Sequence, residues 1–225
     1  MDHCLEQHQS LKPFSLTHVL YPKDNPIWGK AMALAALSPF ALLTAYVAAF
    51  AARRSLVLLA ALTGQLISEA LNAVLKRWWR QARPSACLGK GYGMPSSHAQ
   101  FSTFAATFLS LYVYQRVHCQ SLWLKHLLIL AMLLSGAFVA YSRISLTYHT
   151  TAQVLVGSSI GVICGIAWYG LIEGILRPLG LHRRLLSSSL GHWLSLRDDA
   201  TIHNVWSQER QASLQTWSQI KPKSE

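Results

Sequence analysis

Residues 124–141 read LKHLLILAMLLSGAFVAY, and Lys125 is the only side chain among them with a full charge at neutral pH. A helix needs about 20 mainly apolar residues to cross the hydrocarbon layer of a bilayer. Four other stretches come close to that length and composition, and they cover residues 31–51, 55–75, 100–117 and 153–176. The sequence therefore predicts an all-α fold, a polytopic membrane bundle of about five or six helices.

The stretch 55–75 is the least convincing of the five spans, because it contains Gln65, Glu69 and Asn72. Polar side chains are costly in lipid, so we expect these three to face protein. The pattern leaves open whether this segment crosses the membrane fully.

Composition and charge also point to a membrane. Of 225 residues, 52% are hydrophobic and 13% are charged, whereas soluble domains have about 25% charged residues. The formal net charge is +11, but the basic residues flank the predicted spans instead of covering a soluble face. This distribution favours membrane lipids as partners and argues against nucleic acid.

The length suits a single membrane-embedded domain over residues 1–225. We expect a polar N-terminal segment at 1–28 and a polar, basic tail at 178–225, with a short helix at 202–217. None of the four cysteines stands in a CxxC or Cys/His spacing, so the sequence predicts no metal site and no cofactor.

Three polar clusters contain the residues that could carry chemistry. They are KRWWRQARP at 76–84, YGMPSSH at 92–98, and Ser142-Arg143 followed by His149 and Gln153. The predicted spans 100–117 and 124–141 take the chain across the membrane and back, so all three clusters lie at the same membrane face. That face collects three cations and two imidazoles: Lys76, Arg83, Arg143, His98 and His149.

Such a set of side chains suits phosphoryl transfer. Positioned cations stabilise the negative charge that the transition state spreads over the phosphoryl oxygens. Arginine offers a planar fork that matches phosphate, and lysine offers a point charge. A neutral imidazole can attack phosphorus to give a phosphohistidine, while a second imidazole protonates the leaving oxygen and then activates water.

The clusters resemble the three signature motifs of the type 2 phosphatidic acid phosphatase (PAP2) family, which read K-x6-RP, PSGH and SR-x5-H-x3-D. The first motif is matched fully, and the other two are matched in all but one position each. The resemblance implies a metal-independent phosphatase with a haloperoxidase-like helical core. It implies that His149 is the nucleophile and that His98 is the general acid and then the base. The residues that it implies for phosphate binding are Lys76, Arg83, Ser96, Ser97 and Arg143.

Two positions depart from the motifs: Ser97 stands at the glycine and Gln153 at the aspartate. Gln153 lies four residues beyond His149, so the two share a helical face. Its amide oxygen can accept the imidazole N–H, but it cannot stabilise an imidazolium as a carboxylate would. Glu69 could compensate, since Glu69 and Asn72 share one helical face with the lysine of the first motif. We therefore expect Gln153, Glu69 and Asn72 to support the residues that touch phosphate.

Flanking residues narrow the resemblance to the eukaryotic dolichyl-diphosphatase branch of the family. They include Gln100-Phe101, the run Tyr148-His149-Thr150, and stretches near both ends at 16–22 and 197–205. This likeness implies hydrolysis of dolichyl diphosphate to dolichyl phosphate and phosphate at the lumenal face of the endoplasmic reticulum. That reaction recycles the lipid carrier of protein N-glycosylation.

Two other hypotheses stay open. The chain could be a phosphatase of another lipid phosphate, such as phosphatidate, a sphingoid phosphate or another polyprenyl phosphate. It could also be a non-catalytic membrane protein that keeps the fold, which Gln153 favours and the two retained histidines oppose. Comparing lipid substrates would separate the enzymatic alternatives.

Overall fold

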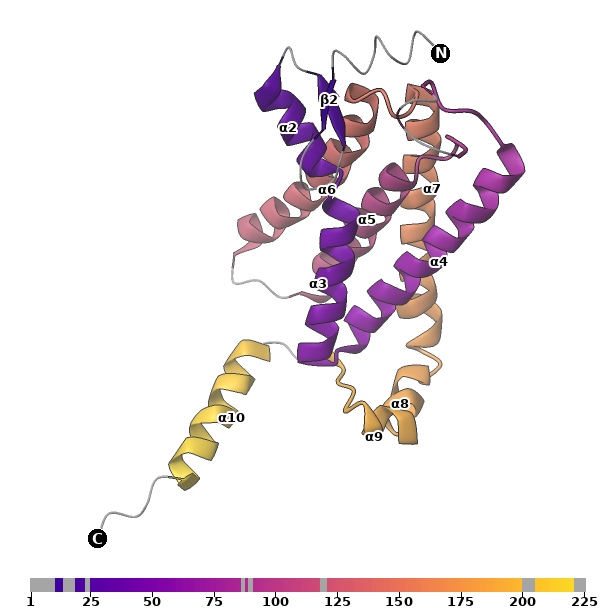
Figure 1. Ribbon diagram of the computed structural model, residues 1–225. Coiled ribbons are helices and arrows are strands. Elements are labelled where there is room, and N and C mark those ends of the chain that lie inside the picture. The colour runs from indigo at the N-terminus through magenta and orange to yellow at the C-terminus, as the bar shows by residue number, and fades with distance from the viewer. Residues whose placement is uncertain are drawn as a thin grey trace.

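The protein is a bundle of long helices with a two-stranded hairpin at one end (Figure 1). The computed structural model describes residues 11–13, 19–22, 25–85, 88, 91–117, 121–199 and 205–220. The elements in chain order are β1 (Leu11–Pro13), β2 (Leu20–Pro22), α2 (Pro26–Ala35), α3 (Ser38–Arg53), α4 (Leu56–Trp79), α5 (Ser97–Arg116), α6 (Leu122–Ser145), α7 (Thr151–Tyr169), the π-helical segment η2 (Gly170–Leu176), α8 (Leu181–Leu186), α9 (Ser189–Trp193) and α10 (Val205–Ile220).

Three helical segments are long and apolar enough to cross a membrane on their own. They are α4, α6 and the stretch Thr151–Leu176, which joins α7 to η2. The pair α2 and α3 passes the same test only together, bent by 41° at the break between them. The all-α membrane fold predicted from the sequence is therefore confirmed, and the chain is a multi-pass membrane protein.

The span predicted at 31–51 is not one continuous helix, because α2 ends at Ala35 and α3 begins at Ser38. Pro39 lies in the first turn of α3. Proline has no N–H, and its ring collides with the carbonyl four residues earlier, so a straight helix cannot run through this position. The break leaves Ala36 between two helices.

Helix α5 covers the predicted span 100–117, but it is not among the described segments that are apolar enough to cross on their own. It lies in the middle of the bundle and packs against α7, α6, α4 and α3 (Figure 1). Protein therefore surrounds it instead of lipid, and Gln100 is fully buried there. The sequence made 100–117 a more convincing membrane span than 55–75. In the structure α4, which covers 55–75, is long and apolar enough to cross on its own, and α5 is not.

Buried amides connect α4 to α5. Asn72 donates to the Gln100 side-chain oxygen at 2.7 Å, and Gln100 donates to the Ser68 carbonyl at 2.7 Å. Gln65 donates to the Phe101 carbonyl at 3.3 Å. Two of the three polar side chains that made 55–75 a doubtful span, Gln65 and Asn72, thus face a partner helix, where hydrogen bonds offset the cost of their burial.

Three glycines let α7 approach α5 closely. A Cβ atom on Gly157 would lie 2.6 Å from the Ser96 carbonyl oxygen, and one on Gly161 would overlap the Thr103 hydroxyl. A Cβ on Gly165 would lie 3.0 Å from the Thr107 side chain. Small residues every fourth position therefore set the distance between these two helices.

The described residues of the polar tail form three helices, and part of the tail is fastened to the bundle at the end opposite β1 and β2 (Figure 1). Arg197 forms a parallel bridge with Ser55, next to the start of α4. Arg177 donates to Asp198 at 2.8 Å and to Glu173 at 2.7 Å, and Arg116 pairs with Glu173 at 2.6 Å. The short helix expected at 202–217 is observed as α10.

Candidate active site

The three sequence clusters meet at one end of the bundle, where α4 ends and α5 begins. Lys76 donates to the Ser97 hydroxyl at 2.6 Å, which joins the first cluster to the second. The Ser96 N–H donates to the Gln153 carbonyl at 3.1 Å, which joins the second to the third. The convergence that the return trip of the chain predicted is therefore present in the structure.

His149 is 4% exposed, and its ring is held by Gln153. The distance from His149 Nδ1 to Gln153 Oε1 is 3.2 Å. The other end of the Gln153 amide donates from Nε2 to the Ala82 carbonyl at 2.8 Å, which fixes Oε1 as the acceptor that faces the ring. The Nδ1 atom must then carry the proton, and the Nε2 atom keeps its lone pair.

The surroundings of His149 favour its neutral form. Burial, followed by the positive charges of Arg83 and Arg143, lowers the pKa of His149 from 6.5 to about 4, against the opposing hydrogen bond of Gln153. A neutral imidazole with a free lone pair is the nucleophilic form of the side chain.

Gln153 is itself held from several sides. Its side chain and that of Thr150 form a reciprocal capping box at the start of α7. A Cβ atom on Gly93 would lie 2.7 Å from Gln153 Nε2, so only glycine lets the loop pack this closely. The ring of His149 is thus positioned by an amide that has little freedom to move.

Several buried donors at this end of the bundle have no hydrogen-bond partner in the described part of the chain. They are Arg83 Nε, Arg143 Nε and Nη1, and the Ser96 hydroxyl. Arg143 is 4% exposed, and its guanidinium stacks 4.3 Å from the centre of the Tyr148 ring. Burial also lowers the pKa of Arg83. Burying such donors unpaired is costly, so the site is complementary to an anion with several oxygens.

His98 faces the same region from the start of α5. Its Nε2 lies 3.2 Å from the Ala36 carbonyl oxygen, and a carbonyl can only accept, so Nε2 carries a proton in this bond. Arg143 and His149 are within electrostatic reach of the His98 ring. The break between α2 and α3 therefore supplies the group that orients this second imidazole.

Of the two supporting residues predicted on α4, Asn72 has a partner on another helix and Glu69 has no ion-pair partner among the described residues. Asn72 is buried and bonds Gln100, so its partner is α5. Glu69 is half-buried on α4 and forms no ion pair within 4.0 Å in the described part of the chain. The described residues also contain no group of three or more His, Cys, Asp or Glu side chains that could hold a metal ion.

Sequence reasoning missed three contributors to the site: Ala36, Thr150 and Tyr148. The pattern Thr150-x-x-Gln153 is the sequence signature of a capping box and could have revealed Thr150. The Ala36 carbonyl and the Tyr148 ring carry no such signal, because both act through contacts with residues far away or across a turn.

Comparison with known proteins gives a family and close relatives. Residues 55–176 match the PAP2 superfamily. The chain is 33% identical over 207 residues to dolichyldiphosphatase 1 of Homo sapiens, covering 87% of this chain and 85% of the relative. It is 35% identical over 204 residues to dolichyldiphosphatase 1 of Dictyostelium discoideum, covering 89% and 88%. It is 34% identical over 206 residues to lipid phosphate phosphatase gamma of Arabidopsis thaliana, covering 88% of each. No solved structure matches the chain.

Proposed function

Because the chain belongs to the PAP2 superfamily, we propose that it is a lipid pyrophosphate phosphatase that hydrolyses dolichyl diphosphate to dolichyl phosphate and inorganic phosphate. The relatives named dolichyldiphosphatase cover most of the chain. The observation that carries the proposal is the set of buried, unpaired donors of Arg83, Arg143 and Ser96 beside His149.

The first step forms a phosphohistidine. His149 Nε2 attacks the terminal phosphorus, and the bond from that phosphorus to the bridging oxygen breaks. His98, protonated on both ring nitrogens, gives its Nδ1 proton to the bridging oxygen, which leaves as dolichyl phosphate, while its Nε2–H stays on the Ala36 carbonyl. Lys76, Arg83 and Arg143, with Ser96 and Ser97, hold the phosphoryl oxygens and stabilise the charge that develops on them.

The second step releases phosphate. The neutral His98 now takes a proton from water, and the water oxygen attacks phosphorus as the N–P bond to His149 breaks. The electron pair returns to His149 Nε2, and both histidines regain their starting forms. Gln153 keeps the His149 ring oriented through both steps by accepting its Nδ1–H.

We assign the enzyme to the endoplasmic reticulum membrane, with the active site toward the lumen, where it would recycle the lipid carrier of N-glycosylation. Positive side chains near membrane ends favour the cytosolic side. At the end opposite the site they include Arg53, Arg54, Arg183 and Arg184. At the site end, the three cations of the motifs are used by the chemistry and do not count as topology signals.

A second candidate is a phosphatase of lipid monophosphates, which the Arabidopsis relative's name, lipid phosphate phosphatase, favours. Purified protein in detergent with EDTA decides between them when dolichyl diphosphate, dolichyl phosphate and phosphatidate are offered in parallel. We expect phosphate release from the diphosphate and its loss in His149→Ala. A preference for phosphatidate would remove the dolichyl assignment and keep the family chemistry. Release from none of the three would mean that the fold has lost its activity.

A further inference from the structure

A groove of about 430 Å³ lies between α3, α5 and α6, below the end of the bundle that holds the site. Its lining is almost wholly apolar and rich in small side chains. Six of its lining residues are Ser38, Ala41 and Ala45 on α3, Ser102 on α5, and Gly136 and Val139 on α6.

The upper end of this groove lies near His98, one helical turn above its lining residue Ser102. The Ser102 hydroxyl, which lines the groove, donates to the His98 carbonyl at 2.7 Å. Ser38, which also lines it, is two residues beyond Ala36, whose carbonyl holds His98 Nε2. The Ser38 oxygen is buried without a partner in the described part of the chain. The end of the groove lined by Ser38 is therefore the end nearest the second imidazole.

The geometry of phosphoryl transfer says where the lipid must lie. The attacking and leaving oxygens or nitrogens stand roughly in line on opposite sides of phosphorus. With His149 as the attacking group, the bridging oxygen points away from His149 and toward the group that protonates it. The isoprenoid chain, which is joined to that oxygen through the other phosphate, then leaves the site beside His98.

We infer that the groove between α3, α5 and α6 binds the isoprenoid chain of the substrate next to its diphosphate. This inference rests on the proposed function, since it takes His149 as nucleophile and His98 as acid. Alanine, glycine and serine at the lining leave room for the methyl branches of an isoprenoid. Burial of those branches supplies binding energy away from the reacting phosphate.

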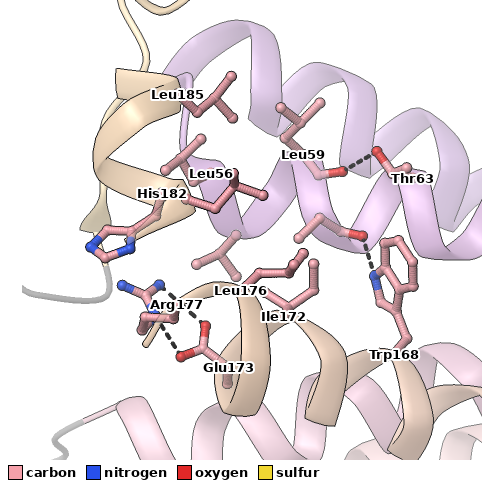
Figure 2. Close-up of a pocket in the computed structure, with 13 residues that line it drawn as sticks. Leu56, Leu59, Thr63, Trp168, Ile172, Glu173, Leu176, Arg177, His182 and Leu185 are labelled. Carbon is pink, nitrogen blue, oxygen red and sulfur yellow. Dashed lines mark hydrogen bonds and ion pairs between the residues drawn. The ribbon is translucent and has the colours of Figure 1, made fainter. Parts of the chain in front are cut away.

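Two other apolar pockets are placed less well for the isoprenoid chain. The pocket in Figure 2, about 240 Å³, lies between the start of α4, η2 and α8, with the Arg177–Glu173 pair at its rim. Its Thr63 stands thirteen residues before Lys76 on α4, about 20 Å along the helix axis. A smaller groove of about 210 Å³, lined by Ile67 and Leu171, runs between α4 and α7 and does not include α3 or α6.

A large side chain placed in the groove should lower activity on substrates with a long isoprenoid chain more than on substrates with a short one. Ala45→Phe is the test variant, since Ala45 is exposed on α3 and tolerates a larger side chain. Ala51→Phe is the matched control: it makes the same change on the same helix, about 120° away around the axis. We expect Ala45→Phe to lower the ratio of kcat/KM for dolichyl diphosphate to that for isopentenyl diphosphate by about tenfold or more, with the control within about twofold of wild type. Equal effects of the two variants on this ratio would overturn the inference.

A binding measurement separates this inference from the proposed function. A photoreactive isoprenoid diphosphate is cross-linked to His149→Ala protein, and the labelled peptides are identified by mass spectrometry. We expect labels on α3 near Ala45 and on α6 near Gly136, whether or not the wild-type protein proves to be a phosphatase. Labels near Ile67 and Leu171, or no specific label, would overturn the groove assignment.

Discussion

Gln153 shows how a single side chain sets the behaviour of the catalytic histidine. It accepts the Nδ1–H of His149 as the aspartate of the family motif would, but it brings no negative charge. A carboxylate would favour the imidazolium, whereas the amide leaves the effects of burial and of Arg83 and Arg143 unopposed by charge. The tautomer is fixed, and the ring stays neutral well below pH 6.5.

The acidic side of the pH profile tests this role of Gln153. The neutral His149 is the active form, so kcat/KM of the wild type should fall only as pH approaches about 4. Gln153→Glu adds a carboxylate that raises the pKa of His149, and the fall in kcat/KM should move toward neutral pH. Because both proteins meet the same substrate, its ionisations cancel in the comparison. Superimposable acidic limbs would show that the charge at this position does not reach His149.

The unpaired donors of Arg143 predict a trade-off between activity and stability. Arg143→Met keeps much of the volume but removes a buried charge that has two donors without partners. We expect phosphate release to drop by about 10³-fold, as for other lost anion-binding groups, and the ligand-free protein to become no less stable. Inorganic phosphate should raise the unfolding temperature of wild type and not of this variant.

Arg77→Met is the control for that experiment, because Arg77 is exposed at the same end of α4. Its unfolding temperature should still rise with phosphate. A rise of the same size in Arg143→Met would place the phosphate elsewhere.

The motif residues of the site were predictable from the sequence because their spacing is local and their chemistry is specific. The hydrogen bond between Gln153 and His149 followed from four-residue spacing alone. The role of the Ala36 carbonyl was not predictable, since any residue has a carbonyl and only the bend at Pro39 brings this one to His98. The role of Glu69 remains a prediction: Glu69→Gln should lower turnover, although Glu69 forms no ion pair within 4.0 Å among the described residues.

At the level of helices, hydropathy did not predict correctly which segments face lipid when a helix is surrounded by protein. The apolar test favours segments that face lipid, such as α6, and undervalues α5, whose polar side chains bond neighbouring helices. A count of apolar residues also gave no sign of the helix break at Pro39. Composition therefore predicted the class and approximate spans, while the break follows from the local chemistry of Pro39 and the central position of α5 from tertiary packing.

The contact between α5 and α7 predicts a clear difference between two glycines. Gly161→Ala would push a methyl group into the Thr103 hydroxyl and the Gln100 carbonyl of α5. We expect it to lower the free energy of unfolding by about 1–3 kcal/mol, the usual cost of overpacking. Gly174→Ala is the control, because nothing lies within 4 Å of its added methyl group. Thermal unfolding in detergent measures both, and equal unfolding temperatures would contradict the close packing.

Across the whole molecule, the two ends of the bundle are built in opposite ways. In the described residues the site end keeps donors of Arg83 and Arg143 unpaired, whereas the far end, apart from Arg116 Nε, pairs its buried arginine donors with carboxylates. Glu173 and Asp198 side chains are 7% and 6% exposed there, on either side of Arg177. Burial lowers the pKa of Arg177, but its hydrogen bonds to Asp198 and Glu173 outweigh that effect and leave the pKa raised.

Removing Arg177 should therefore destabilise the protein strongly. Arg177→Met leaves two buried carboxylates with one partly exposed arginine, Arg116, and we expect a loss of about 3–5 kcal/mol. Arg183→Met, an exposed position on α8, serves as the control and should change little. Thermal unfolding in detergent compares the two, and similar unfolding temperatures would mean that the ion cluster contributes no net stability.

The same ion cluster has a consequence for biosynthesis. A growing chain emerges from the ribosome with its N-terminal part first. Glu173 and Arg177 thus leave the ribosome before Asp198, and Arg197 reaches Ser55 only after every membrane helix has been made. A chain that ends before residue 198 would contain its membrane helices but not the contact between Arg177 and Asp198. In such a chain Arg177 would keep Glu173 as a partner but lack Asp198. The cell's quality control would then recognise the truncated product by this incompletely neutralised arginine.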